Sequence, residues 1–161
     1  MIRLAELRDL PALKSIYDEA VLHSTATFVT KARTEAEMLT WFQAHTGHHA
    51  LLVYERDGRA VGYASLSTYN PKQAYDTSVE LSIYVDLAAR GRHIGDELMA
   101  AILDFARNSD RIHNVISLIT SENEVSVRLH QKYGFRLCGR IEDAGRKFGR
   151  YLGVDVYQLL V

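Results

Sequence analysis

The sequence is poor in several features: it has one cysteine, two prolines and no long apolar run in 161 residues. A single cysteine excludes an internal disulfide and a multi-cysteine zinc site, which is typical of a reducing compartment. The formal net charge is only −1, so no global charge favours nucleic acid or an anionic membrane. No run approaches the roughly 20 apolar residues that span a bilayer, and the first residues lack a signal-peptide pattern. We therefore expect a soluble, cytoplasmic protein.

The remaining composition is that of an ordinary globular domain. Apolar residues make up 47% of the chain and charged residues 24%. At this length a chain buries roughly two-thirds of its unfolded surface, which is enough for a hydrophobic core. No repeat or linker divides the sequence, so the prediction is one domain over residues 1–161.

Hydrophobic periodicity and turn residues predict seven strands and four helices. Helices are expected after Asp9, after the capping box that begins at Thr34, after Gly91 and after the capping pattern of residues 121–124. Residues 142–153 are expected to be a polar connection. This order is typical of an α/β protein with a mixed sheet. Strands are expected at residues 2–5, 49–55, 60–67, 78–85, 115–120, 135–141 and 154–161.

Residues 79–95 are the most informative stretch. They read as a strand, a loop with two glycines and two arginines, and the start of an amphipathic helix. The free N–H groups and the dipole of a helix start favour phosphate. The Gly-Lys-Ser/Thr ending of a nucleotide P-loop and the Gly-x-Gly-x-x-Gly dinucleotide pattern are both absent. The stretch therefore predicts a phosphate site of another kind.

Two motifs resemble the cofactor elements of a known superfamily. The pattern Arg90-x-x-His93-x-Gly95 resembles the Gln/Arg-x-x-Gly-x-Gly/Ala pyrophosphate loop of the GCN5-related N-acetyltransferases (GNAT), which holds acetyl-coenzyme A (acetyl-CoA). Residues 123–135 resemble the second element, Asn-x-x-Ala-x-x-Leu-Tyr-x-x-x-Gly-Phe. His93 stands where the loop motif has its first glycine. We expect its Cβ to obstruct the pyrophosphate or to change the local backbone.

Other segments narrow the resemblance to one branch of this superfamily. Residues 25–28, 74–80, 126–130 and 144–151 look like segments of the phosphinothricin (methionine sulfoximine) acetyltransferases. The resemblance covers essentially the whole chain. It implies the GNAT fold, a mixed, twisted sheet of about seven strands with four helices that is splayed at the acetyl-CoA site. It also implies a homodimer.

The resemblance further implies where acetyl-CoA binds. Its phosphates would meet the helix start after Gly91, and its pantetheine arm would pair with the end of the preceding strand. The arginines of the loop are explained equally well as solvated charge, and the residues that begin the next helix as ordinary caps. The implied cofactor residues are Tyr84, Val85, Asp86, Arg90, Arg92, His93, Ile94, Gly95, Asp96, Glu97, Asn123 and Ser126.

Acetyl transfer to an amine needs a base for the amine, stabilisation of an oxyanion and a proton for the leaving thiolate. Glu80 sits in mid-strand, where a carboxylate is unusual, although a solvated strand face also explains it. By resemblance Glu80 is the candidate general base, directly or through water. His130 becomes a candidate proton donor or an organiser of the acetyl group, whereas the pattern alone favours a packed or partly exposed histidine. No metal is needed for this chemistry, and the sequence indicates none.

The implied acceptor is a small amine, namely an amino acid or an analogue such as phosphinothricin or methionine sulfoximine. Lys147 and Arg150 suit an acceptor carboxylate or phosphinate, or they are ordinary loop charges. Cys138 is expected to be a buried strand residue and not a nucleophile. The implied acceptor residues are Phe28, Tyr75, Asp76, Thr77, Lys147, Arg150 and Tyr151.

Two other functions remain open at this point. One is an acyl-CoA-binding regulatory module without turnover, which the histidine in the pyrophosphate loop favours. The other is an acetyltransferase that acts on a polyamine or on a protein N-terminus. The balanced net charge gives a polyamine no special support.

Overall fold

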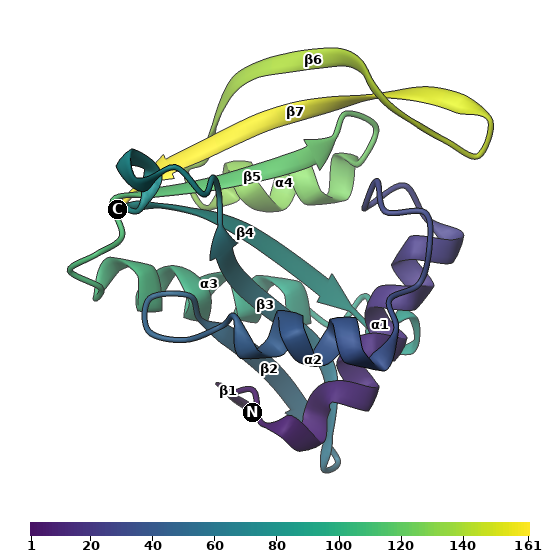
Figure 1. Cartoon of the computed structure of the whole chain (residues 1–161), viewed down its shortest axis with the longest axis vertical. Coiled ribbons are helices and arrows are strands. Elements are labelled where there is room, and N and C mark those ends of the chain that lie inside the picture. Colours follow the sequence, from purple (N-terminus) through teal and green to yellow (C-terminus); the bar gives the residue numbers. More distant parts are fainter.

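A seven-stranded mixed sheet organises the chain (Figure 1). The computed structural model describes residues 1–161. The element order confirms the predicted alternation of strands and helices. The strands are β1 (Ile2–Leu4), β2 (Leu51–Arg56), β3 (Arg59–Thr68), β4 (Ser78–Val85), β5 (Asn114–Thr120), β6 (Arg136–Lys147) and β7 (Arg150–Leu160). The helices are α1 (Leu10–His23), α2 (Glu35–Gln43), α3 (Ile94–Arg107) and α4 (Glu124–Lys132), and short 3₁₀ turns lie at Leu7–Asp9, Gln73–Tyr75 and Leu87–Ala89.

The strand order is β1-β2-β3-β4-β5-β7-β6, and only the β4–β5 pair is parallel. The predicted hairpin between β2 and β3 is confirmed: Asp57 and Gly58 both have positive φ, 52° and 75°, as a tight two-residue turn with the strand twist requires. Every other neighbouring pair is antiparallel.

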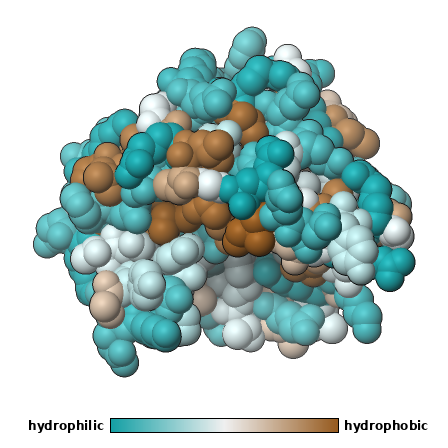
Figure 2. All heavy atoms as spheres, turned by 90° about the horizontal axis from the view of Figure 1, so that it is seen from above, coloured by the Kyte–Doolittle hydropathy of each residue, from teal (hydrophilic) through white to brown (hydrophobic).

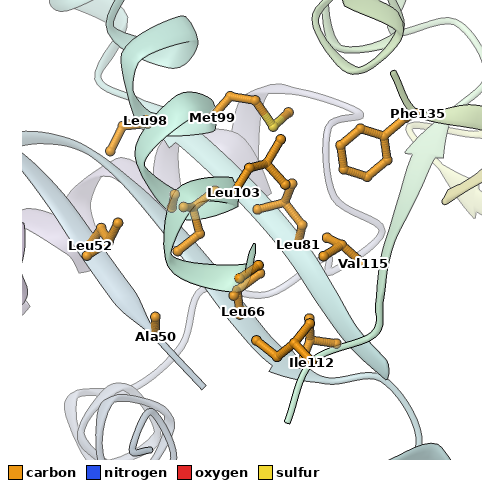
Figure 3. Packing of buried hydrophobic residues seen from close by; sticks show 14 of the residues in the cluster. Ala50, Leu52, Leu66, Leu81, Leu98, Met99, Leu103, Ile112, Val115 and Phe135 are labelled. Atoms are coloured by element: carbon orange, nitrogen blue, oxygen red, sulfur yellow. The ribbon is translucent and has the colours of Figure 1, made fainter. Parts of the chain in front are cut away.

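The two faces of the sheet bury separate hydrophobic clusters. Because side chains alternate along a strand, neighbours such as Tyr63 and Ala64 of β3 belong to opposite clusters. On one face Leu98 and Leu103 of α3 pack against Leu81 and other strand residues (Figure 3). Helices α1 and α2 cover the opposite face. No helix is both long and apolar enough to cross a membrane.

Strands β4 and β5 separate soon after they begin. Their pairing covers only three positions, the last of which joins Glu80 to Ile116. Beyond this point β4 pairs only with β3, through the match of Val85 with Gly62. The rest of β4 therefore has an unpaired edge that faces a gap, and the expected splay of the sheet is present.

The prediction of a polar connection at residues 142–153 was wrong. Strands β6 and β7 form one long hairpin whose turn lies at Phe148 and Gly149, and the hairpin reaches past β5 towards the loop after α1 (Figure 1). Strand β6 is the edge strand and is exposed on both faces along most of its length. It therefore lacks the apolar alternation by which a half-buried strand is recognised. For the same reason Cys138, predicted to be buried, is exposed.

Candidate active site

A cavity of about 740 Å³ lies on the α1 and α2 side of the sheet and spans the gap between β4 and β5. Tyr84 of β4 and Leu118 of β5 both line it. Its wall is mainly aromatic and hydroxylic, and only two ionised side chains reach it. The lining residues are Tyr17, Ala26, Thr27, Phe28, Val29, Arg33, Trp41, Tyr63, Ser65, Ser67, Glu80, Ser82, Tyr84, Leu118, Thr120, Ala144 and Val154.

Glu80 is the only carboxylate in this wall. It shares one face of β4 with Ser82 and Tyr84, and all three side chains line the cavity, as strand alternation requires. Glu80 forms no ion pair within the chain, and its half-burial raises the pKa of its carboxyl group above the ordinary value. A partly desolvated carboxylate without a partner is a better proton acceptor than a solvated one.

Three tyrosines form the floor of the cavity. The ring centroids of Tyr17 and Tyr63 each lie 5.4 Å from that of Tyr84. Burial raises the pKa values of Tyr63 and Tyr84 above the ordinary tyrosine value, so both phenols keep their protons at neutral pH. These hydroxyl groups add hydrogen-bonding capacity to the cavity without adding charge.

Arg33 supplies the positive charge and was not predicted. Its guanidinium carbon lies 4.5 Å from the ring centroid of Tyr17 and 5.6 Å from that of Trp41. It precedes the capping box of α2, in which Thr34 and Glu37 exchange hydrogen bonds as predicted. The capping box was the available signal, since it places Arg33 immediately before Thr34, the N-cap of a helix that covers the sheet.

The hairpin holds the loop that closes one side of the cavity. Lys147 is buried and donates a hydrogen bond to the Thr27 carbonyl at 2.8 Å. Arg150 donates two hydrogen bonds, of 2.7 and 2.8 Å, to the carboxylate of Glu122, which also accepts one from Thr25. The two cations predicted for the acceptor therefore have partners within the chain, and neither lines the cavity.

Among the predicted acceptor residues, only Phe28 lines the cavity. Tyr75 and Thr77 lie just before β4, and Asp76 there forms an ion pair with Arg111. Tyr151 is exposed near the hairpin turn, where the Arg146 guanidinium lies 5.7 Å from its ring centroid. The structure thus brings Glu80, Tyr84 and Phe28 together and leaves the other predicted acceptor residues around the outside.

The start of α3 offers unpaired backbone donors. His93 precedes the helix in the left-handed conformation, with φ 60° and ψ 11°, and no side chain caps the helix. The N–H groups of Ile94, Gly95 and Asp96 have no acceptor within the helix. A Cβ on Gly95 would lie 3.8 Å from Leu129 and 4.0 Å from Val85, so β4, α3 and α4 converge here. These free donors fit the pyrophosphate of acetyl-CoA.

The charged residues around α3 are mostly paired. Arg90 donates to the Val85 carbonyl and to Glu19, each at 3.2 Å. Lys132 forms an ion pair with Asp96, lowers the pKa of that carboxyl group and offsets its charge in the first turn. Arg92 is exposed and lines a second cavity of about 420 Å³.

The other predicted cofactor residues have clear local roles. The Asp86 carboxylate accepts a hydrogen bond from the Ala88 N–H and so caps the turn after β4. Asn123 caps α4 by accepting from the Ser126 N–H at 3.2 Å. Glu97 is exposed in the first turn of α3.

His130 is buried between α4 and β5. Its Nδ1 lies 2.8 Å from the Ser126 carbonyl, which only accepts, so Nδ1 carries the proton. Its Nε2 lies 2.8 Å from Ser117 Oγ and accepts from that hydroxyl group when the ring is neutral. Burial lowers the pKa of His130 despite the carbonyl contact. The ring is therefore neutral at pH 7, and it does not line the cavity. The chain holds no cluster of three or more His, Cys, Asp or Glu side chains fit for a metal ion.

Comparison with known proteins identifies the family. The family model described as acetyltransferase (GNAT) domain matches residues 2–154. The chain is 34% identical over 160 residues to the L-methionine sulfoximine/L-methionine sulfone acetyltransferase of Pseudomonas aeruginosa, covering 98% of this chain and 92% of that protein. It is 38% identical over 154 residues to the phosphinothricin N-acetyltransferase of Streptomyces coelicolor, covering 93% and 90%.

A solved structure agrees with this assignment. The putative acetyltransferase yncA from Salmonella typhimurium, solved with its cofactor acetyl-CoA, has a TM-score of 0.95 at 33% identity and covers 99% of this chain and 92% of that chain. The protein therefore belongs to the GNAT family of acetyltransferases. The predicted family, the seven-stranded GNAT fold and the class of acetyl-CoA-dependent N-acetyltransferase are confirmed.

Proposed function

We propose that this protein transfers the acetyl group of acetyl-CoA to the amine of a free amino acid, or of an analogue such as methionine sulfoximine or phosphinothricin, within one ternary complex. The observation that carries this proposal is the position of Glu80, the only carboxylate in a cavity that spans the splayed strands. The names of the two similar enzymes support an acceptor of this class.

Acetyl-CoA supplies an acetyl group activated as a thioester. The chain would hold it at two places: the free N–H groups of Ile94, Gly95 and Asp96 bind the pyrophosphate, and the unpaired edge of β4 near Tyr84 and Val85 binds the pantetheine arm. An N–H group of that strand edge also stabilises the oxyanion. Both places lie at the junction of β4 and α3, which supports a single bound cosubstrate.

Glu80 would act on the acceptor amine. An amine is mostly protonated at neutral pH and cannot attack until it loses a proton. Because burial raises the pKa of Glu80, its carboxylate is a stronger base than that of an exposed glutamate. Proton removal proceeds directly or through a water molecule in the cavity. As the amide bond forms, the C–S bond of acetyl-CoA breaks, and the leaving thiolate takes a proton from solvent.

For His130 we propose a positioning role. Its two hydrogen bonds join Ser126 on α4 to Ser117 on β5. Strand β5 forms the side of the gap that faces β4. A neutral ring with both nitrogens engaged is poorly placed to donate a proton. Of the two predicted roles, its contacts favour that of an organiser.

The cavity argues against a polyamine as acceptor. A polyamine would need several carboxylates to offset its charges, whereas this wall has Glu80 alone together with the cation Arg33. An acyl-CoA-binding module without turnover would have no use for a partly buried, unpartnered carboxylate there. The amino acid remains the best-supported acceptor.

A homodimer and a cytoplasmic location are also proposed. Figure 2 shows apolar side chains gathered in a band on the face that carries the β6–β7 hairpin. An exposed apolar patch of this kind favours association, and the exposed thiol of Cys138 suits a reducing compartment. Light scattering tests the dimer. The exposed apolar residues of these strands and their turn are Leu137, Ile141, Phe148, Tyr151 and Leu160.

An acceptor panel tests the proposed function. The purified protein is incubated with acetyl-CoA and, in separate reactions, with methionine sulfoximine, phosphinothricin, methionine, spermidine and a peptide with a free N-terminus. Thiol release gives the rate, and mass spectrometry locates the acetyl group. We expect an N-acetyl product from amino acids or their analogues. Acetylation of spermidine or the peptide alone, or tight acetyl-CoA binding without any product, would refute the proposal.

A further inference from the structure

The acceptor cavity contains two opposite charges. Glu80 on β4 is the anion, and Arg33 just before α2 is the cation. The tyrosines of the wall add no charge, because burial keeps Tyr63 and Tyr84 protonated. An amino acid also carries two opposite groups on one small molecule. The charges of the cavity are thus complementary to the α-amino and α-carboxylate groups of its proposed acceptor.

Arg33 is half-buried and has no ion-pair partner in the chain. Its guanidinium lies over the Tyr17 ring and near the Trp41 ring, at 4.5 and 5.6 Å from their centroids. Aromatic contacts of this kind use the flat face of the group and leave its N–H edge available. Arg33 makes no hydrogen bond within the chain, so its donors are free for a ligand.

The other cations near the acceptor region are already engaged. Lys147 donates to the Thr27 carbonyl, and Arg150 binds Glu122 through two hydrogen bonds. Of the acidic residues that follow it in sequence, Glu35 is exposed and forms no ion pair with Arg33. Glu37 accepts from the Thr34 N–H in the capping box. Arg33 is therefore the one guanidinium of the cavity wall that is held in place and left without an anion.

We propose that Arg33 binds the α-carboxylate of the acceptor between Tyr17 and Trp41, while the amine of the same molecule faces Glu80. The planar guanidinium matches a carboxylate with two parallel hydrogen bonds, which fixes orientation as well as charge. Arg33 would thus restrict the enzyme to α-amino acids and exclude amines that lack a carboxylate. This inference rests on the proposed N-acetyltransferase function and adds the residue that selects the acceptor.

Paired acceptors test this assignment. L-Methionine sulfone is compared with its carboxamide and with the amine formed by its decarboxylation, in steady-state assays at saturating acetyl-CoA. The wild-type enzyme should prefer the carboxylate by roughly 10- to 100-fold in kcat/KM, because the other two leave Arg33 unpaired. In Arg33→Gln the KM for the carboxylate should rise by roughly the same factor with little change in kcat. The KM for the decarboxylated amine should stay unchanged.

Lys31→Gln is the matched control, since Lys31 is an exposed cation of the same segment and does not line the cavity. It should leave all three KM values unchanged. Arg33→Lys should recover only part of the preference, because a lysine lacks the paired donors. An unchanged KM for acetyl-CoA shows that a variant is folded. The wild-type comparison among the three acceptors tests the assignment even if a variant fails to fold.

Each failure has a separate meaning. Equal kcat/KM for the carboxylate and its carboxamide in the wild-type enzyme would overturn the role of Arg33 and leave the N-acetyltransferase intact. An equal loss for all three acceptors in Arg33→Gln would overturn it as well, because Arg33 would then only shape the cavity. Absence of any acetylated amine would refute the proposed function, and this inference with it.

Discussion

Gly145 of β6 lies directly against the ring of Phe28, the aromatic residue that closes one side of the cavity. A Cβ at position 145 would come within 2.6 Å of Phe28 Cδ2, so the phenyl ring or the strand would have to move. The glycine is therefore required by close approach, and the hairpin determines where the phenyl ring lies. The shape of the acceptor cavity consequently depends on an edge strand far away in the sequence.

Gly145→Ala should displace Phe28 and alter the cavity. We expect a loss of about 1–3 kcal/mol in the free energy of unfolding from overpacking, together with a higher KM for the acceptor and an unchanged KM for acetyl-CoA. Thermal unfolding and steady-state kinetics measure both effects. Gly139→Ala is the control, because a Cβ at 139 on the same strand meets nothing within 4 Å. Equal effects of the two substitutions would contradict the contact.

His93→Gly should improve both stability and cofactor binding. His93 has φ 60°, a conformation that costs a residue with a Cβ about 1–2 kcal/mol and glycine almost nothing. Glycine also loosens the unfolded chain, so we expect a net gain of roughly 1 kcal/mol or less in the free energy of unfolding. Removing the Cβ should also lower the KM for acetyl-CoA.

The neighbouring substitution Arg92→Gly separates the relief of backbone strain at His93 from the entropic cost of adding a glycine. Arg92 is exposed and has no positive φ, so glycine there brings only the entropic cost and should destabilise the protein. A destabilised His93→Gly variant with a higher KM for acetyl-CoA would show that the histidine side chain contributes to binding.

The pKa of Glu80 makes both activity and stability depend on pH. Its folded-state pKa is raised by burial, so activity that needs the carboxylate should fall with acid above the pH at which an ordinary glutamate titrates. Stability changes in the opposite direction. A raised carboxyl pKa stabilises the fold fully below the unfolded pKa, and this contribution is lost as pH rises through the folded pKa.

Glu80→Gln tests the stability effect. The amide removes the cost of burying a charge, so the variant should melt at a higher temperature than the wild-type protein at neutral pH. The difference should shrink as pH falls through the raised pKa of Glu80 and should reach its minimum below the ordinary glutamate pKa. Melting curves across this pH range provide the measurement. A constant difference at every pH would show that Glu80 is not the titrating group.

Lys147→Met should loosen the loop that carries Phe28. The substitution leaves the Thr27 carbonyl without its buried donor, which costs about 1–3 kcal/mol. We expect a lower melting temperature and a higher KM for the acceptor. Lys72→Met, at an exposed lysine without an ion pair, should change neither quantity. A normal acceptor KM in Lys147→Met would mean that other contacts hold the loop.

The sequence predicted the parts of the fold that local chemistry determines. The turn at Asp57 and Gly58, the cap at Asn123 and the helix that follows Gly91 all follow from short patterns that the structure confirms. The β6–β7 hairpin did not follow, because a strand exposed on both faces has no hydrophobic period. Cys138 was misplaced for that reason.

The composition of the cavity depends on tertiary packing. Glu80 was recognised because a carboxylate in mid-strand is unusual, whereas Arg33 and Trp41 reach the cavity only when α2 packs over the sheet. Lys147 and Arg150 looked like free cations because their partners lie far along the chain, at Thr27 and Glu122. Such pairings have no signal in a local pattern.

The kcat of Glu80→Gln at saturating acetyl-CoA and amino acid tests the central claim most directly. Glu142→Gln, at an exposed glutamate of β6, is the matched control. We predict that kcat falls roughly 10²- to 10⁴-fold in Glu80→Gln, while the KM for acetyl-CoA and the activity of the control stay at wild-type values. A Glu80→Gln enzyme that keeps the wild-type kcat would contradict the account, because the amine would then lose its proton without this carboxylate.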